Sequence, residues 1–256
     1  MLLHPLPAFT DNYIWTLRDS PAGAPIVVDP GDAAPVLAMA EATGIAPAAL
    51  LLTHHHADHV GGAAELLRHW PGLPVFAPED ERIDVDCRRV GDGDSVDAGP
   101  WRFEALAVPG HTRSHVAFHG HGLLFCGDTL FSLGCGRPFE GSPGQLLASL
   151  ERLAALPPAT RVCCGHEYTL ANAAFAARVD PHNAALERRA AEARAQRERG
   201  APTLPALLGD EVAANPFLRV DDAAVRAAVA ARLGRAPADR VETFAELRRW
   251  KDGFVA

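Results

Sequence analysis

Short apolar runs, separated by glycine, proline and polar residues, occupy the first two thirds of the chain. Apolar runs of this length that end in turn-forming residues predict β-strands. Strands are expected over residues 9–17, 26–28, 50–53, 75–77, 101–108, 115–118, 123–126 and 161–164. Two of the intervening segments, 35–42 and 61–70, have helical character. Strands that alternate with helices in this way predict an α/β fold.

Helices replace strands after residue 168. Four segments there are expected to be helical, namely 170–179, 184–199, 223–233 and 240–250. An earlier helix is expected after Ser142, because an N-cap serine, a proline at the first helical position and the capping-box residue Gln145 precede a stripe of leucines. We therefore predict two domains, residues 1–168 and a helical domain over residues 169–256.

Composition and charge narrow the class of protein. The chain has 256 residues, of which 48% are hydrophobic and 22% charged, as in an ordinary globular protein. Its formal net charge of −8 argues against a nucleic-acid partner, because phosphate binding needs a basic surface. Nearly every basic residue is an arginine, and Lys251 is the single lysine of the sequence.

Cysteine usage and the absence of targeting signals suggest a cellular location. The five cysteines are an odd number without the spacing of a disulfide framework, which indicates reduced thiols. The N-terminal residues lack the charged and apolar regions of a signal peptide. No run approaches the roughly 18 apolar residues that a membrane span needs. These features predict a cytoplasmic protein without a membrane partner.

A histidine cluster directly follows the apolar run 50–52. His54, His56, Asp58 and His59 place four potential metal ligands within six residues. In an extended segment, residues two apart point the same way, so His54 and His56 can face one ion, while Asp58 and His59 fall where a helix would begin. A solvated surface tract is the alternative. The offset of the two ligand pairs favours two metal ions side by side, with His55 as a bystander.

Three further residues of ligand type follow predicted strands. His111, Asp128 and His166 each come directly after a glycine, which suits a sharp turn of the backbone near a ligand. The carboxyl ends of strands are where α/β enzymes build their sites. Any one of these residues alone would more readily be structural. Together with the histidine cluster they predict a complete metal site.

Several motifs of the chain resemble those of the metallo-β-lactamase superfamily, and more closely those of the hydroxyacylglutathione hydrolase (glyoxalase II) family. The superfamily motifs are Thr-His-His-His-Ala-Asp-His at 53–59, Pro-Gly-His-Thr at 109–112, Gly-Asp-Thr-Leu-Phe at 127–131 and Gly-His-Glu-Tyr-Thr at 165–169. Those typical of the narrower family are 11–15, 134–137, 215–219 and 248–252. The resemblance implies a four-layer αββα sandwich as the catalytic domain (residues 1–168) and a helical substrate-binding domain (169–256).

The resemblance also implies a ligand set for two divalent metal ions. One ion would be bound by His54, His56 and His111, the other by Asp58, His59 and His166, and Asp128 would bridge them. Asp58 and Asp128 would in addition be the catalytic residues. Imidazole and carboxylate ligands suit zinc, with iron or manganese as alternatives.

The reaction that the resemblance implies is hydrolysis of the thioester of S-(2-hydroxyacyl)glutathione. The typical substrate is S-D-lactoylglutathione, which gives glutathione and D-lactate in the detoxification of methylglyoxal. A hydroxide bridging the two ions would attack the thioester carbonyl, and the protein would act as a monomer. The residues expected to contact glutathione are Arg137, Tyr168, Arg248 and Lys251.

The chain departs from the family pattern at three positions. Arg137 and Phe139 replace a lysine and a tyrosine, and Ser114 interrupts a Gly-His-Thr-x-Gly-His pattern. These changes bear on glutathione affinity more than on the hydrolytic chemistry.

The main alternative is a glutathione persulfide dioxygenase with mononuclear iron, which is similar in the first domain but lacks the helical extension that carries Arg248 and Lys251. A lactonase or β-lactamase is disfavoured by the same C-terminal motifs.

Overall fold

The computed structural model describes residues 1–254, which form two compact units whose segments alternate along the chain. The N-terminal unit comprises Met1–Val108, Ser114–Gly127 and Cys163–His166. The C-terminal unit comprises Pro109–Arg113, Asp128–Val162 and the chain from Glu167 onward. The predicted division at residue 168 is a different partition of the chain, and it stays a prediction.

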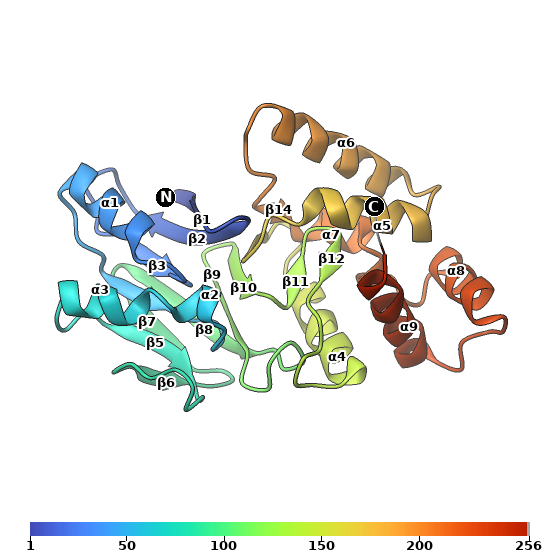
Figure 1. The fold of residues 1–256 in the computed structure, drawn as a ribbon, viewed down its shortest axis with the longest axis horizontal. Coiled ribbons are helices and arrows are strands. Elements are labelled where there is room, and N and C mark those ends of the chain that lie inside the picture. Colours follow the sequence, from blue (N-terminus) through green and yellow to red (C-terminus); the bar gives the residue numbers. More distant parts are fainter. Residues whose placement is uncertain (255–256) are drawn as a thin grey trace. The chain divides into compact units, whose positions relative to one another are not determined.

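The first sheet of the N-terminal unit has six strands in sequence order (Figure 1). They are β1 (Leu2–Ala8), β2 (Asn12–Arg18), β3 (Ile26–Val28), β4 (Ala49–Leu51), β5 (Val75–Pro78) and β6 (Arg88–Val90). β1 to β3 are antiparallel, whereas β3 to β6 are parallel. The strand predicted over residues 9–17 therefore starts too early. Phe9, with a φ of 50°, lies in the turn of a hairpin whose first strand was not predicted.

Helices pack on one face of this sheet. They are α1 (Ala34–Thr43), the short α2 (Ala57–Val60) and α3 (Ala63–His69). Val36 of α1 and Leu66 of α3 are buried in one apolar cluster with Val27, Leu50 and Val75 from the strands. Parallel neighbours need crossover connections, and α1 and α3 supply those between β3, β4 and β5. This arrangement places the end of β4, and the histidine cluster behind it, at one edge of the sheet.

A second six-stranded sheet has the order β14-β13-β10-β9-β8-β7. Its strands are β7 (Ser95–Ala98), β8 (Trp101–Ala107), β9 (Val116–Gly120), β10 (Leu123–Gly127), β13 (Arg161–Cys164) and β14 (Ala206–Leu207). Within the N-terminal unit the indole N–H of Trp15, on β2, donates to the carbonyl of Cys164 at 2.9 Å. This contact fixes the end of β13, and the His166 that follows it, against the first sheet.

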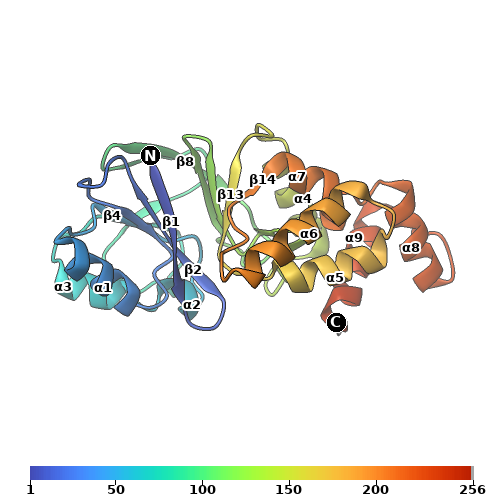
Figure 2. The same ribbon diagram turned by 90° about the horizontal axis from the view of Figure 1, so that it is seen from above.

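The C-terminal unit is mainly helical, as seen from a second direction in Figure 2. Its elements are the hairpin β11 (Leu130–Phe131) and β12 (Gly134–Cys135), then α4 (Pro143–Ala154), α5 (Thr169–Val179), α6 (Ala184–Glu198), α7 (Leu208–Ala214), a 3-10 helix (Pro216–Leu218), α8 (Ala223–Leu233) and α9 (Arg240–Asp252). The capping box predicted at Ser142 and Gln145 is present. All four helices predicted after residue 168 are present, whereas α7 was not predicted. Among the residues described, no helix combines the length and apolar character needed to cross a membrane.

Candidate metal centre and substrate pocket

The N-terminal unit carries five of the seven predicted ligands. His54 and His56 follow β4, Asp58 and His59 lie on α2, and His166 follows β13. The close approach of α2 depends on Gly31, where an added Cβ would lie 1.9 Å from the carbonyl oxygen of Asp58.

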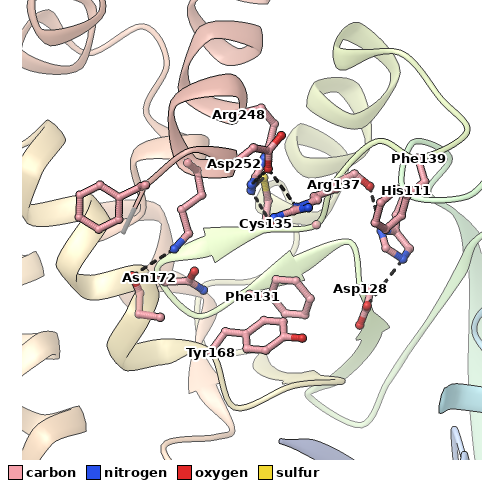
Figure 3. Close-up of a pocket in the computed structure, with 14 residues that line it drawn as sticks. His111, Asp128, Phe131, Cys135, Arg137, Phe139, Tyr168, Asn172, Arg248 and Asp252 are labelled. Atoms are coloured by element: carbon pink, nitrogen blue, oxygen red, sulfur yellow. Dashed lines mark hydrogen bonds and ion pairs between the residues drawn. The ribbon is translucent and has the colours of Figure 1, made fainter. Parts of the chain in front are cut away.

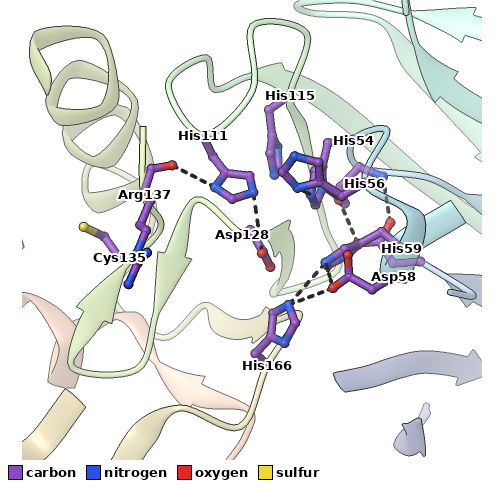
Figure 4. Close-up of polar contacts among 12 residues, drawn as sticks. His54, His56, Asp58, His59, His111, His115, Asp128, Cys135, Arg137 and His166 are labelled. Atoms are coloured by element: carbon purple, nitrogen blue, oxygen red, sulfur yellow. Dashed lines mark hydrogen bonds and ion pairs between the residues drawn. The ribbon is translucent and has the colours of Figure 1, made fainter. Parts of the chain in front are cut away.

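Asp58, His59 and His166 form a compact group of metal-ligand type (Figure 4). The Nε2 atoms of His59 and His166 are 3.4 Å apart. The Oδ2 atom of Asp58 lies 3.4 Å from His59 Nε2 and 3.3 Å from His166 Nε2. His166 above all, followed by His59, lowers the pKa of Asp58, so the carboxylate is ionised at neutral pH. The three donor atoms therefore converge as a divalent cation requires.

Two carboxylates orient the histidines of this group by contacting their Nδ1 atoms. Asp29 Oδ2 lies 3.0 Å from His59 Nδ1, and Asp11 Oδ1 lies 2.8 Å from His166 Nδ1. Each Nδ1–H donates to a carboxylate, which places the ring's lone pair on Nε2. This is the carboxylate–histidine arrangement found behind metal ligands. The tautomers of both rings are therefore those that metal binding needs.

His54 is oriented in the same sense by Thr53. The Thr53 hydroxyl donates its hydrogen to Asp29 Oδ2 at 2.7 Å. The hydroxyl oxygen, Thr53 Oγ1, therefore accepts from His54 Nδ1 at 3.0 Å. His54 Nε2 then lies 3.0 Å from His56 Nδ1. His55 contacts Asp80 at 3.5 Å. The two histidines with alternate spacing thus share a direction, as the sequence predicts, and His55 does not.

The C-terminal unit carries the other two predicted ligands. His111 Nδ1 donates to the carbonyl of Arg137 at 2.9 Å, and His111 Nε2 lies 3.6 Å from Asp128 Oδ2. Gly136 allows this approach, since a Cβ there would lie 1.9 Å from the carbonyl oxygen of Asp128. Gly110 has a φ of 145° and packs on Leu146 of α4. Close packing therefore requires glycine at positions 110 and 136.

His111 and Asp128 border a pocket of about 400 Å³ within the C-terminal unit (Figure 3). Aromatic residues and several charged groups line it. Its side chains include those of Phe131, Cys135, Arg137, Phe139, Tyr168, Asn172, Arg248, Lys251 and Asp252. All four residues predicted to contact glutathione are among them.

Three of these four residues present polar groups to the pocket. Arg137 is more than half exposed, and its Nε lies 3.0 Å from Asp252 Oδ1. Lys251 donates to the carbonyl of Ala171 at 3.1 Å. Burial and, after it, the neighbouring arginines lower the pKa of Lys251. The ring of Tyr168 packs edge-on against Phe131, with ring centroids 5.2 Å apart.

Arg248 is different, because its side chain is only 7% exposed. Its Nη1 donates to the carbonyl of Cys135 at 2.8 Å, and its Nη2 donates to Asp252 Oδ1 at 2.7 Å. The guanidinium also lies over the ring of Phe217. Burial raises the pKa of the Cys135 thiol to about 11, so it stays protonated beside the arginine. Arg248 therefore joins α9 to β12.

Sequence reasoning missed three carboxylates of these sites. Asp29 directly follows the apolar run 26–28, and Asp11 and Asp252 lie within the family motifs 11–15 and 248–252. A signal existed for Asp29, since an aspartate that ends a buried strand stands where α/β proteins build sites. No local signal pairs Asp11 with His166 or Asp252 with Arg137.

Family models cover nearly the whole chain. Residues 12–166 match the metallo-beta-lactamase superfamily, and residues 167–254 match the hydroxyacylglutathione hydrolase C-terminus. The chain therefore belongs to the metallo-β-lactamase superfamily.

Similar proteins place it more narrowly. It is 59% identical over 254 residues to a hydroxyacylglutathione hydrolase of Xylella fastidiosa (strain M23), covering 99% of this chain and 98% of that protein. It is 58% identical over 256 residues to one of Xanthomonas campestris pv. campestris (strain B100), covering 100% of both. Within the superfamily, the chain belongs to the hydroxyacylglutathione hydrolase family, as its motifs predict.

Solved structures agree on the fold. TTHA1623 in a di-iron-bound form is 33% identical, with a TM-score of 0.55 over 65% of this chain and 92% of that one. ETHE1 from Myxococcus xanthus has a TM-score of 0.66 over 99% of this chain and 91% of that one, but at 22% identity the likeness concerns the fold alone. The predicted fold class is confirmed. Together with the histidine and aspartate groups, the fold indicates a divalent-metal site.

Proposed function

We propose that the chain hydrolyses the thioester of S-(2-hydroxyacyl)glutathione, with S-D-lactoylglutathione as the typical substrate. The observation that carries this proposal is the pocket of the C-terminal unit, where His111 and Asp128 share one lining with Arg137 and Lys251 (Figure 3). A glutathione thioester has two carboxylates close to a reactive carbonyl, and such a lining suits both. The full-length similarity to hydroxyacylglutathione hydrolases supports the same substrate class.

Two divalent metal ions are part of the proposal. His54, His56 and His111 would hold one ion, Asp58, His59 and His166 the other, and Asp128 would bridge them. The support from the structure is that His54, His59, His111 and His166 all have an oxygen acceptor at Nδ1, which leaves Nε2 as the donor to a metal. The donor set suits zinc, with iron or manganese as alternatives. When bound, two such ions supply a water of lowered pKa and positive charge for a developing oxyanion.

The protein's own residues would bind and orient the substrate. Arg137 can offer its remaining guanidinium donors to a glutathione carboxylate while Asp252 holds its Nε. Lys251 would add a second cation, and the hydroxyl of Tyr168 a hydrogen bond. Arg248 would act through Cys135 and Asp252, which its guanidinium already contacts.

The leaving group of the proposed reaction is a thiolate with a free pKa near 8.5. The site therefore needs no strong general acid to protonate it. Asp58 and Asp128 are the proposed catalytic carboxylates. The lowered pKa of Asp58 keeps it in the ionised form that can hold an ion or orient a water.

The cellular setting is proposed from composition. None of the five cysteines, all of which lie among the described residues, forms a disulfide, which supports a reducing cytoplasm and a role in methylglyoxal detoxification there. The net charge of −8 supports a small-molecule substrate in place of a nucleic acid. We propose that the monomer is the active form.

The proposal is tested by the loss of thioester absorbance with S-D-lactoylglutathione, with and without a chelator. The wild-type protein is expected to release glutathione in a chelator-sensitive reaction, and Asp128→Ala is expected to abolish it. No turnover by metal-loaded wild-type protein would overturn the proposal. Oxygen uptake with glutathione persulfide would instead support the dioxygenase alternative.

A further inference from the structure

The hairpin β11–β12 forms one wall of the substrate pocket, and hydrogen bonds to buried side chains hold it in place. Phe131, Cys135, Gly136 and Arg137, on or directly after the hairpin, line the pocket. The two strands pair through only two residues each. Two-stranded ribbons of this size are not stable by themselves, so the position of the wall depends on what anchors the turn.

A fully buried carboxylate anchors the tip of the hairpin. Glu211, on α7, is 0% exposed. Its Oε1 accepts from the Ser132 hydroxyl at 2.7 Å, and its Oε2 accepts from the Leu133 backbone N–H at 2.7 Å. Leu133 has a φ of 58°, a left-handed conformation that is strained for a leucine and persists where its surroundings impose it.

Asn215, four residues further on, completes the anchor. Its Nδ2 donates to the carbonyls of Phe131 at 3.2 Å and Gly134 at 2.9 Å, on either side of the turn. Its Oδ1 accepts from the backbone N–H of Phe217 and so caps the 3-10 helix. This geometry gives a physical role to the Asn-Pro-Phe motif that the sequence singles out, because one amide ties the hairpin to the segment after α7.

Two other helices contact the same turn. Asn172, on α5, donates to the Ser132 carbonyl at 3.1 Å, and Arg189, on α6, reaches the Ser132 hydroxyl at 3.3 Å. A Cβ on Gly134 would lie 2.4 Å from the Asn172 amide, so the hairpin and α5 are in close contact. The turn is thus held through its backbone by side chains from separate helices.

We propose that Glu211 and Asn215 are positioning residues for substrate binding, because together they fix the wall that carries Cys135 and Arg137. The inference rests on the proposed function for the identity of the substrate. Glu211 does not contact the pocket, so its effect must pass through the hairpin. Buried hydrogen-bond networks act in this way when every member is satisfied.

The substitution that tests the proposal is Glu211→Gln. Glutamine keeps the size of the side chain but replaces one acceptor oxygen by a donor, which then faces Leu133 N–H or the Ser132 hydroxyl. For this isosteric change we expect a KM about tenfold higher with S-D-lactoylglutathione, with kcat and the metal content per chain nearly unchanged.

The matched control is Glu246→Gln. Glu246 is another buried carboxylate of the C-terminal unit, on α9, but it pairs with Arg232 and Arg249 and does not line the pocket. We expect this variant to lower Tm and leave KM unchanged. Asn215→Ser is a second test of the anchor, and it should raise KM in the same direction as Glu211→Gln.

Hydrogen exchange of the segment 129–137 provides a readout that does not depend on turnover. Glu211→Gln should accelerate exchange there, and Glu246→Gln should not. If Glu211→Gln lowers Tm like the control but leaves both KM and this exchange unchanged, the positioning role is overturned. If the wild-type protein has no thioesterase activity but the exchange rises as expected, the anchor stands and the proposed substrate falls.

Discussion

Asp29 provides the most direct test of how the N-terminal unit prepares its metal ligands. Its side chain is 5% exposed and accepts three contacts, from Thr53 N–H at 2.7 Å, from the Thr53 hydroxyl at 2.7 Å and from His59 Nδ1 at 3.0 Å. The perturbation is Asp29→Asn, which keeps the shape of the side chain and removes its charge.

The magnitude follows from the tautomer of His59. In the variant, the amide oxygen can still accept from Thr53 N–H, but the amide nitrogen then faces Thr53 Oγ1 and His59 Nδ1. An N–H directed at Nδ1 favours the His59 tautomer with its proton on Nε2, which cannot donate to a metal. Loss of a hydrogen bond to a charged group costs about 1.5–3 kcal/mol. Substitutions behind metal ligands weaken affinity by roughly 10–100-fold, which is a free-energy change of similar size.

The assay is competition with a chromophoric chelator for zinc, which resolves the two proposed ions by affinity. In Asp29→Asn we expect the ion at Asp58, His59 and His166 to bind roughly 10–100-fold more weakly. Asp80→Asn is the matched control. Asp80 is a buried carboxylate of the same unit that contacts Arg82, Ser114 and His55 but none of the proposed ligands.

Two results would refute this reasoning. Zinc affinity in Asp29→Asn equal to that of the wild-type protein would mean that the carboxylate does not set the tautomer of His59. An equal loss of affinity in Asp29→Asn and Asp80→Asn would mean that the effect comes from general destabilisation of the unit.

Three further predictions concern the C-terminal unit. In steady-state kinetics, Arg137→Ala should raise KM roughly tenfold, a loss of about 1.4 kcal/mol of binding free energy, with kcat little changed. Arg137→Lys should recover part of the affinity. An unchanged KM in Arg137→Ala would mean that Arg137 does not contact the substrate. Because burial and neighbouring arginines lower the pKa of Lys251, its positive charge is lost at a lower pH than that of an ordinary lysine, whose pKa is near 10.4. KM should therefore rise in that alkaline range, and Lys251→Arg should remove the rise; a wild-type KM that stays flat with pH would contradict this. Ser142→Ala should lower the free energy of unfolding by about 1 kcal/mol through loss of the capping box, measured by denaturant titration, while KM stays constant as an internal control.

Local patterns predicted much of the fold. The apolar stripe of α4 is buried at Leu146, Leu147, Leu150 and Leu153, as its spacing requires. The strands that precede His54 and His166 are also where the apolar runs predict them. β1 was not predicted, because Pro5 and Pro7 lie within it and proline inside a run argues against a strand. Strands as short as β11, β12 and β14, with two residues each, have no measurable period.

The anchor of the hairpin lay beyond the reach of sequence reasoning. Glu211 and Ser132 are 79 residues apart, and nothing near either residue indicates the other. A glutamate in a short helix is ordinarily a surface residue. Only the packing of α7 beneath the hairpin makes it a buried acceptor for a strained backbone.

The sequence by itself determined which residues could bind metal and where the chain would offer them. Ligand chemistry belongs to the side chain, and the alternation of an extended segment fixes the direction of His54 and His56. For His59, His111 and His166, the tertiary structure decided which ring nitrogen is left to face a metal, because the groups that accept from Nδ1 come from distant parts of the chain. Asp11 and His166, for example, are 155 residues apart. A hydrogen bond across that separation exists only after the sheets have packed, and so the tautomer of a ligand is a property of the fold.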